Sequence, residues 1–169
     1  LLEEIKPELG LPEDRALIHV LRSDAFFLRN DDAGAETEIN AALALNADVA
    51  EVHLSHSTLL SRQGKQDQAE AELDRALTLA PDHYQALYRK AEMRRQQADP
   101  ENPIGFYSKA IEIDGKSPPA RIARALAYIA LDKDELASMD AETILEINPD
   151  HTVAKYVRAL LMARKKQYD

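Results

Sequence analysis

The 169-residue chain contains no cysteine and no tryptophan, and it has only five glycines and three phenylalanines. The lack of cysteine excludes disulfides, thiolate metal sites and a cysteine nucleophile, and it suits a reducing or an oxidising compartment equally well. Cytoplasmic and periplasmic locations therefore both stay open. Wholly apolar runs are only a few residues long, so we expect no membrane-spanning helix.

Basic residues are also in the minority. Lysine and arginine number 21 against 30 aspartates and glutamates, which gives a formal net charge of −9. A nucleic-acid backbone requires a basic surface, so this balance argues against a nucleic-acid partner. Apolar residues make up 45% of the chain, which is ordinary for a globular protein.

What the sequence does contain is a period of 34 residues. Pro81-Asp82-His83 returns as Pro149-Asp150-His151, and Gly115 stands midway, at 115 − 81 = 34 and 149 − 115 = 34. A set of residues 34 apart is here called a column, and three columns consist mainly of small residues. They are Ser23, Ser57, Ala91, Ala125 and Ala159; Ala35, Ala69 and Ala137, broken by Pro103; and Ala42, Ala76 and Ala110, broken by Ile144. Small residues recur in this way where two helices cross closely.

Within each period the apolar residues are three or four apart, the spacing of helices. A polar stretch with Gly64 at its centre separates two such helical stripes, and the Pro81 column ends the second stripe. Each period is therefore predicted to form a helix, a tight turn and an antiparallel helix, which makes the fold all-α.

These residues resemble the tetratricopeptide pattern of W-x2-L-G-x2-Y, then A-x3-F, then P. The resemblance is carried by Ser57, Leu60, Ala69, Leu73, Ala76 and Pro81. It implies a right-handed superhelical solenoid of antiparallel helix pairs. We expect four full repeats (16–49, 50–83, 84–117 and 118–151), the end of a preceding helix or a linker at 1–15, and the first helix of a fifth repeat at 152–169. Both ends are expected to belong to a longer array.

Two columns depart from that pattern, because they carry basic residues where the family has tryptophan and leucine. They are His19, His53, Leu87, Arg121 and Lys155, and Arg22, His56, Lys90, Arg124 and Arg158. We expect these side chains to lie along the seam, the line of contact within a helix pair, with their charged heads near water or a carboxylate. Glu72 is expected to point outward.

The third repeat is irregular, because Pro100, Pro103 and Gly105 stand where its second helix should begin. Either Asp99 caps that helix with Pro100 as its first residue, or Asn102 caps it with Pro103 as its first residue. The second choice breaks fewer hydrogen bonds and shortens the helix by about one turn.

No catalytic grouping is evident, and we expect neither enzymatic activity nor a cofactor. His53 and His56 have a spacing that metal sites use, but no third ligand is apparent, which favours packing in the seam. His83 and His151 are interpreted as turn residues. The carboxylates Asp31–Asp32 and Asp132–Asp134 are interpreted as solvated turns, and Arg164-Lys165-Lys166 as a solvated helix end.

The resemblance implies that first helices line a concave groove that binds a protein or peptide segment. The sequence favours apolar anchors on the partner, because the expected groove residues are Tyr88, Arg95, Ile122, Leu126, Ile129, Tyr156 and Leu160. Two alternatives stay open: a spacer in an envelope assembly, on a loose resemblance to bacterial arrays of the exopolysaccharide-export type, and the regulatory part of a larger enzyme. Self-association through the truncated repeat ends is a further expectation.

Overall fold

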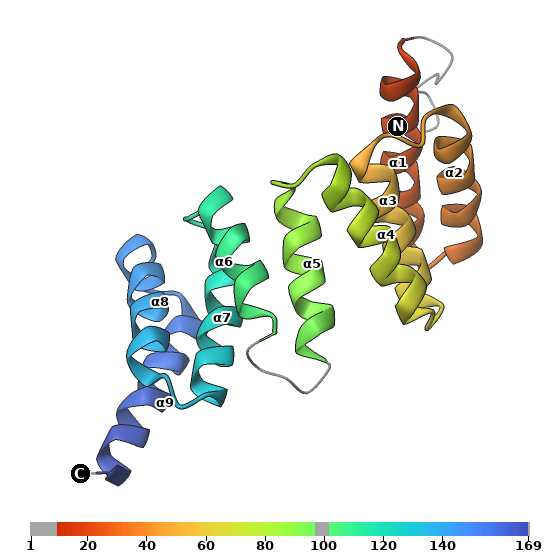
Figure 1. Ribbon diagram of the computed structural model, residues 1–169. Coiled ribbons are helices and arrows are strands. Elements are labelled where there is room, and N and C mark those ends of the chain that lie inside the picture. The colour runs from red at the N-terminus through yellow and green to blue at the C-terminus, as the bar shows by residue number, and fades with distance from the viewer. Residues whose placement is uncertain (1–9, 97–101, 169) are drawn as a thin grey trace. The chain divides into compact units, whose positions relative to one another are not determined.

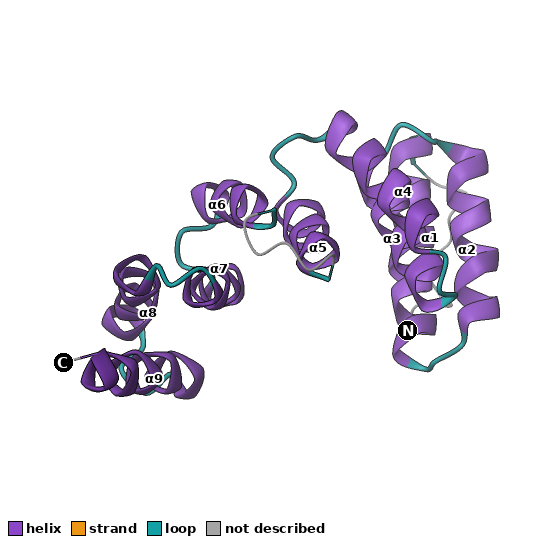
Figure 2. Ribbon diagram, turned by 60° about the horizontal axis from the view of Figure 1, so that its bottom comes forward, coloured by secondary structure: helices purple, strands orange, loops and turns teal. Residues whose placement is uncertain are grey.

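The computed structural model describes residues 10–96 and 102–168, and these form nine α-helices and no strand (Figures 1 and 2). The all-α prediction is confirmed. The helices are α1 (Pro12–Leu28), α2 (Asp32–Leu45), α3 (Ala50–Arg62), α4 (Gln66–Leu79), α5 (Tyr84–Arg95), α6 (Ile104–Ile113), α7 (Pro118–Ala130), α8 (Asp134–Ile147) and α9 (Thr152–Tyr168).

The period of the sequence reappears in the helix boundaries. α3, α5, α7 and α9 begin at residues 50, 84, 118 and 152, each 34 residues after the one before. The chain forms two compact units, one ending at Ala86 and one beginning at Leu87. In the first unit α1 packs on α2 and α3 on α4; in the second, α7 packs on α6, α8 and α9.

The small-residue columns lie in the helix crossings, as predicted, except for Ala159, which is exposed on α9. Every described member of the Ala35 and Ala42 columns that is alanine is fully buried. Ser23 and Ser57 are buried in the same way, and each hydroxyl donates to a backbone carbonyl three residues earlier, at 2.8 and 2.7 Å. A serine therefore fits among apolar neighbours without leaving an unsatisfied polar group.

Two kinds of turn join the helices. Between the helices of a pair, Asn30, Gly64 and Asp132 adopt left-handed backbone conformations, with φ of 56°, 75° and 55°. Before α5 and α9, the Nδ1 atoms of His83 and His151 each accept a hydrogen bond from a backbone N–H three residues later, at 3.3 Å. These two histidines are turn residues, as predicted, and they cap the helices that follow.

Two boundaries differ from the sequence prediction. α1 begins at Pro12, four residues before the expected repeat start at 16, because proline favours the first helical turn and Asp14 Oδ2 accepts the Leu11 N–H at 3.3 Å. α6 begins at Ile104 with Pro103 as the cap, one residue later than expected. Its ten residues against the fourteen of α2, α4 and α8 confirm the loss of about one turn. The alternative start at Asp99 and Pro100 lies outside the described residues.

Candidate functional site

The seam within each helix pair pairs basic side chains with a carboxylate. His19 Nδ1 lies 2.6 Å from Glu38 Oε2 in the first pair, and His53 Nδ1 lies 2.6 Å from Glu72 Oε2 in the second. The second ring nitrogen of His53 lies 2.8 Å from the Ala47 carbonyl oxygen. Both nitrogens of this buried histidine are thus occupied, and the seam interpretation is correct. The expectation that Glu72 points outward is wrong, because the seam histidines draw its carboxylate inward.

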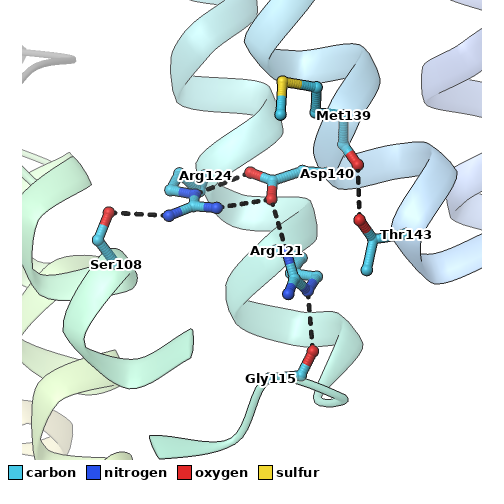
Figure 3. A network of polar contacts seen from close by, with 7 residues as sticks. All are labelled: Ser108, Gly115, Arg121, Arg124, Met139, Asp140 and Thr143. Carbon is cyan, nitrogen blue, oxygen red and sulfur yellow. Dashed lines mark hydrogen bonds and ion pairs between the residues drawn. The ribbon is translucent and has the colours of Figure 1, made fainter. Parts of the chain in front are cut away.

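The same arrangement recurs between α7 and α8, where two arginines take the place of the histidines (Figure 3). Asp140, 2% exposed, accepts hydrogen bonds from Arg121 at 3.0 Å and from two nitrogens of Arg124 at 2.8 and 2.7 Å. The two arginines also donate to the Gly115 carbonyl and the Ser108 hydroxyl. The hydrogen bond to Asp140 raises the pKa of Arg124, so this pair stays charged.

The pair formed by α5 and α6 has a different polar contact from the seam contacts of the other pairs. Its carboxylate column holds Phe106, and the polar contact runs instead from the Tyr107 hydroxyl to Glu92, whose other oxygen accepts from Arg95 at 2.9 and 3.2 Å. Burial, followed by the hydrogen bond to Glu92, raises the pKa of Tyr107. The phenol is therefore a hydrogen-bond donor that keeps Glu92 and Arg95 together at one end of α5.

Two arginines near the ends of α3 and α9 bind aspartates at the starts of α2 and α8. Arg62 donates to Asp32 Oδ1 at 2.6 Å, and Arg164 donates to Asp134 Oδ2 at 3.0 Å. Arg164 also donates to Asp132, and its pKa is raised by these two hydrogen bonds. Asp132 is 83% exposed in a turn, as the interpretation of solvated turns expects, but Asp32, Asp132 and Asp134 each also have an arginine partner, which the sequence did not predict.

The second unit contains an open pocket of about 630 Å³ between α5 and α7, with one contribution from α9. Its walls are mainly apolar, and a charged pair, Glu92 with Arg95, stands on the α5 side. The lining residues are Tyr88, Glu92, Arg95, Pro119, Ile122, Ala123, Leu126, Ala127, Ala130 and Val153.

Four of the seven predicted groove residues line this pocket: Tyr88, Arg95, Ile122 and Leu126. The other three do not. Ile129 packs against the buried cluster that contains Ala125 and Val157. Leu160 is partly buried on α9, and Tyr156 is 64% exposed outside the pocket.

Sequence reasoning missed several lining residues, and two of them, Pro119 and Val153, could have been found. Each precedes a predicted groove position by three residues, at 122 − 119 = 3 and 156 − 153 = 3, so it lies one turn earlier on the same helix face. This spacing was visible in the sequence. The link from Glu92 to Tyr107 was not, because it joins two helices through side chains in different columns.

The site offers apolar surface and hydrogen-bonding groups. Among residues 10–96 and 102–168, no three or more histidine, aspartate or glutamate side chains are placed to hold a metal ion. In the same residues no helix is both long and apolar enough to cross a membrane. What the pocket supplies is a hollow for an apolar side chain beside a charged hydrogen-bonding pair.

Comparison with known families matches residues 50–83 to the tetratricopeptide repeat. Among curated proteins, the chain is 26% identical over 81 residues to a UDP-N-acetylglucosamine–peptide N-acetylglucosaminyltransferase of Giardia intestinalis. That match covers 47% of this chain and 6% of the transferase.

Solved structures share the fold. A tetratricopeptide repeat protein from Parabacteroides merdae superposes with a TM-score of 0.77 at 23% identity, over 91% of this chain and 61% of that protein. Pseudomonas aeruginosa pilF gives 0.82 at 16% identity, over 93% and 72%. YrrB, described as a tetratricopeptide protein with an unusual peptide-binding site, gives 0.72 at 16% identity, over 98% and 81%. Residues 50–83 match the tetratricopeptide repeat, and the chain has the fold of proteins built from such repeats.

Proposed function

Because residues 50–83 match the tetratricopeptide repeat and the chain has the fold of proteins built from such repeats, we propose that it is a non-enzymatic interaction scaffold, and that it binds a segment of a partner protein in the pocket between α5 and α7. The single observation that carries this proposal is the pocket, which gathers Tyr88, Ile122 and Leu126 around an apolar hollow. Aromatic and aliphatic side chains grouped beside a few polar ones are the usual source of binding energy at interfaces.

The pocket favours an extended peptide with one large apolar side chain. Its volume of about 630 Å³ exceeds what one such side chain fills, which leaves room for the adjoining backbone. Glu92 and Arg95 can form hydrogen bonds with that backbone, because the carboxylate accepts from an N–H and the guanidinium donates to a carbonyl oxygen. The Arg95 side chain is half exposed, so these contacts require no rearrangement of the helices.

A matched pair of leucines tests the proposal. Leu126 in the pocket is 44% exposed, and Leu136 on α8 is 41% exposed. Peptides are first selected from a displayed random library on the intact chain, and their affinities are then measured by calorimetry. Leu126→Ala should weaken binding by about 1–2 kcal/mol, as anchor contacts do, while Leu136→Ala should leave the affinity unchanged.

The circular dichroism melting curves of both variants serve as the folding control. Selected peptides that bind Leu126→Ala and Leu136→Ala equally well, with both variants folded, would contradict the pocket as the binding site.

A second candidate role is the regulatory part of a larger enzyme, and the match to the glycosyltransferase favours it. That match lies within a small part of a long protein, so the coding sequence on either side of these residues tests the role. An adjoining glycosyltransferase domain would support it, and unrelated or absent neighbours would count against it. The spacer role in exopolysaccharide export stays a prediction, which no comparison supports.

A further inference from the structure

The three helices that line the α5–α7 pocket are basic, although the chain as a whole is acidic. α5 carries four lysines and arginines against one acidic residue, Glu92, whereas α7 and α9 carry two and five against none. The first helices of the other unit differ, because α1 has three acidic residues against two arginines and α3 has one of each. The charge of the helices around the pocket is therefore opposite in sign to the formal net charge of −9.

The negative charge of the second unit is concentrated on a different helix. α8 carries five acidic residues and no lysine or arginine. One of the five, Asp140, binds both Arg121 and Arg124, so a single negative charge faces two positive charges on α7. α7 thus keeps an excess of positive charge after its seam contacts are made.

Arg95 brings a positive charge to the pocket itself. Its Nε and Nη2 atoms donate to one oxygen of Glu92, at 3.2 and 2.9 Å, and its side chain is half exposed. This contact uses one edge of the guanidinium, so the edge formed by Nη1 and Nη2 can donate to a second carboxylate in the paired geometry that arginine favours. Arg95 can therefore bind the carboxylate of a ligand while it keeps its contact with Glu92.

Tyr107 holds this charge pair in place from the buried side. Its side chain is fully buried on α6, and its hydroxyl donates to the other oxygen of Glu92. Because the phenol and the guanidinium bind different oxygens, the negative charge of Glu92 is compensated on both sides. The compensation reduces the repulsion between Glu92 and an anion that approaches Arg95.

The rest of the pocket suits an uncharged side chain. Apart from Glu92 and Arg95, the described residues that line it carry no charge. A pocket of about 630 Å³ spans about two to three residues of extended chain. An apolar anchor in the hollow and an acidic side chain at Arg95 therefore belong to neighbouring positions of one segment.

Resting on the proposed function, we propose that the partner segment is acidic, with an aspartate or glutamate side chain within about two residues of its apolar anchor. The carboxylate binds Arg95, and the anchor fills the hollow beside Ile122 and Leu126. The basic helices attract such a segment to the pocket of an otherwise acidic chain. A nucleic acid is disfavoured, because the pocket offers one guanidinium and an apolar hollow, whereas a phosphate backbone requires a row of cations.

Selection of peptides from a displayed random library on the intact chain gives the first test. Peptides whose binding is weakened by Leu126→Ala should carry an aspartate or glutamate within about two residues of a large apolar residue. Peptides that depend on Leu126 but lack an acidic residue would overturn this inference and leave the proposed function standing. Failure to select any peptide that depends on Leu126 would overturn both.

The contact with Arg95 is tested with the tightest selected peptide, acetylated and amidated at its ends, and with a copy in which the matching amide replaces its acidic residue. On the unmodified chain, calorimetry should show that the neutral copy binds at least about fivefold more weakly. Arg95→Gln should remove this difference, whereas Arg75→Gln, the same change at an exposed arginine on α4, should retain it. Because the Arg95 side chain is half exposed, its variant should keep the helicity and Tm of the unmodified chain.

Four results would overturn the proposal. Two are equal binding of both peptides by the unmodified chain and a difference that persists in a folded Arg95→Gln chain. A peptide that binds only when its C-terminus is free would assign Arg95 to a chain-end carboxylate instead of a side chain. A labelled oligodeoxythymidylate that binds the unmodified chain and no longer binds Arg95→Gln would assign the site to a nucleic acid.

Discussion

Single carboxylates differ widely in what they contribute to this protein, and their surroundings decide the difference. Asp140 is buried and accepts three hydrogen bonds from two arginines, whereas Glu142, on the same helix, lies half exposed and 3.9 Å from Arg158. A buried ion pair is costly to break, because one partner is then left desolvated and uncompensated. An exposed pair is screened by water and salt.

Asp140→Asn should therefore destabilise the second unit by about 3 kcal/mol, because Arg121 and Arg124 lose their shared counter-charge. Glu142→Gln, the matched change of charge two residues away, should cost less than about 1 kcal/mol. Urea unfolding followed by circular dichroism measures both. Similar midpoints for the two variants would show that the α7–α8 network contributes no more than a surface pair.

At the scale of the helix, the period predicted where helices begin, while local contacts decided the exceptions. The starts of α3, α5, α7 and α9 follow from columns that the sequence displays. The shortening of α6 was predictable from its prolines and glycine. The carboxylate column of Glu38, Glu72 and Asp140 is also periodic, and the basic seam residues could have revealed it.

The pocket was predictable only in part. Tyr88 and Ile122 each pack against a neighbouring helix. The ring centroids of Tyr88 and Tyr107 are 6.0 Å apart, and Ile122 packs against the cluster of Ile144 and Leu145. Tyr156 belongs to the same column, but no described helix follows α9 to cover it. A column gives the helix face of a residue, whereas its role depends on the neighbours that the fold supplies.

Two helical glycines give opposite predictions for the same substitution. A Cβ at Gly34 would overlap the Phe26 ring, while nothing lies within 4 Å of one at Gly105. Gly105→Ala should stabilise the chain by about 0.5–1 kcal/mol through helix propensity. Gly34→Ala should instead destabilise it by about 1–3 kcal/mol, since the aromatic ring must move.

Thermal and urea unfolding of the two alanine variants give the comparison. Stabilisation by both substitutions would mean that Phe26 relaxes freely, and that α1 and α2 are less tightly packed than their contact implies.

At the scale of the whole molecule, the division into two compact units should confine the effect of a change to the unit in which it lies. Each of the two compact units holds its own seam contacts, with His53 and Glu72 in the first and Arg124 and Asp140 in the second. The excess of negative charge in the chain leaves α5, α7 and α9 as basic exceptions. The α5–α7 pocket, the proposed binding surface, lies in the second unit.

The locality of the Asp140 network is testable by amide hydrogen exchange. Asp140→Asn should lower the protection of α7 and α8 and leave α1 to α4 unchanged, because the hydrogen bonds of Asp140, Arg121 and Arg124 join residues of the second unit. Equal loss of protection in all of these helices would instead mean that the chain unfolds as one cooperative body.

The central claim, that the α5–α7 pocket binds a peptide segment, is tested most directly by isoleucine methyl NMR of the intact chain with a library-selected peptide. Ile122 lines the pocket, and Ile147 is an exposed isoleucine on α8 outside it. The account predicts that titration shifts the Ile122 methyl resonance strongly and leaves that of Ile147 in place. A saturable shift at Ile147 with Ile122 unmoved would contradict it.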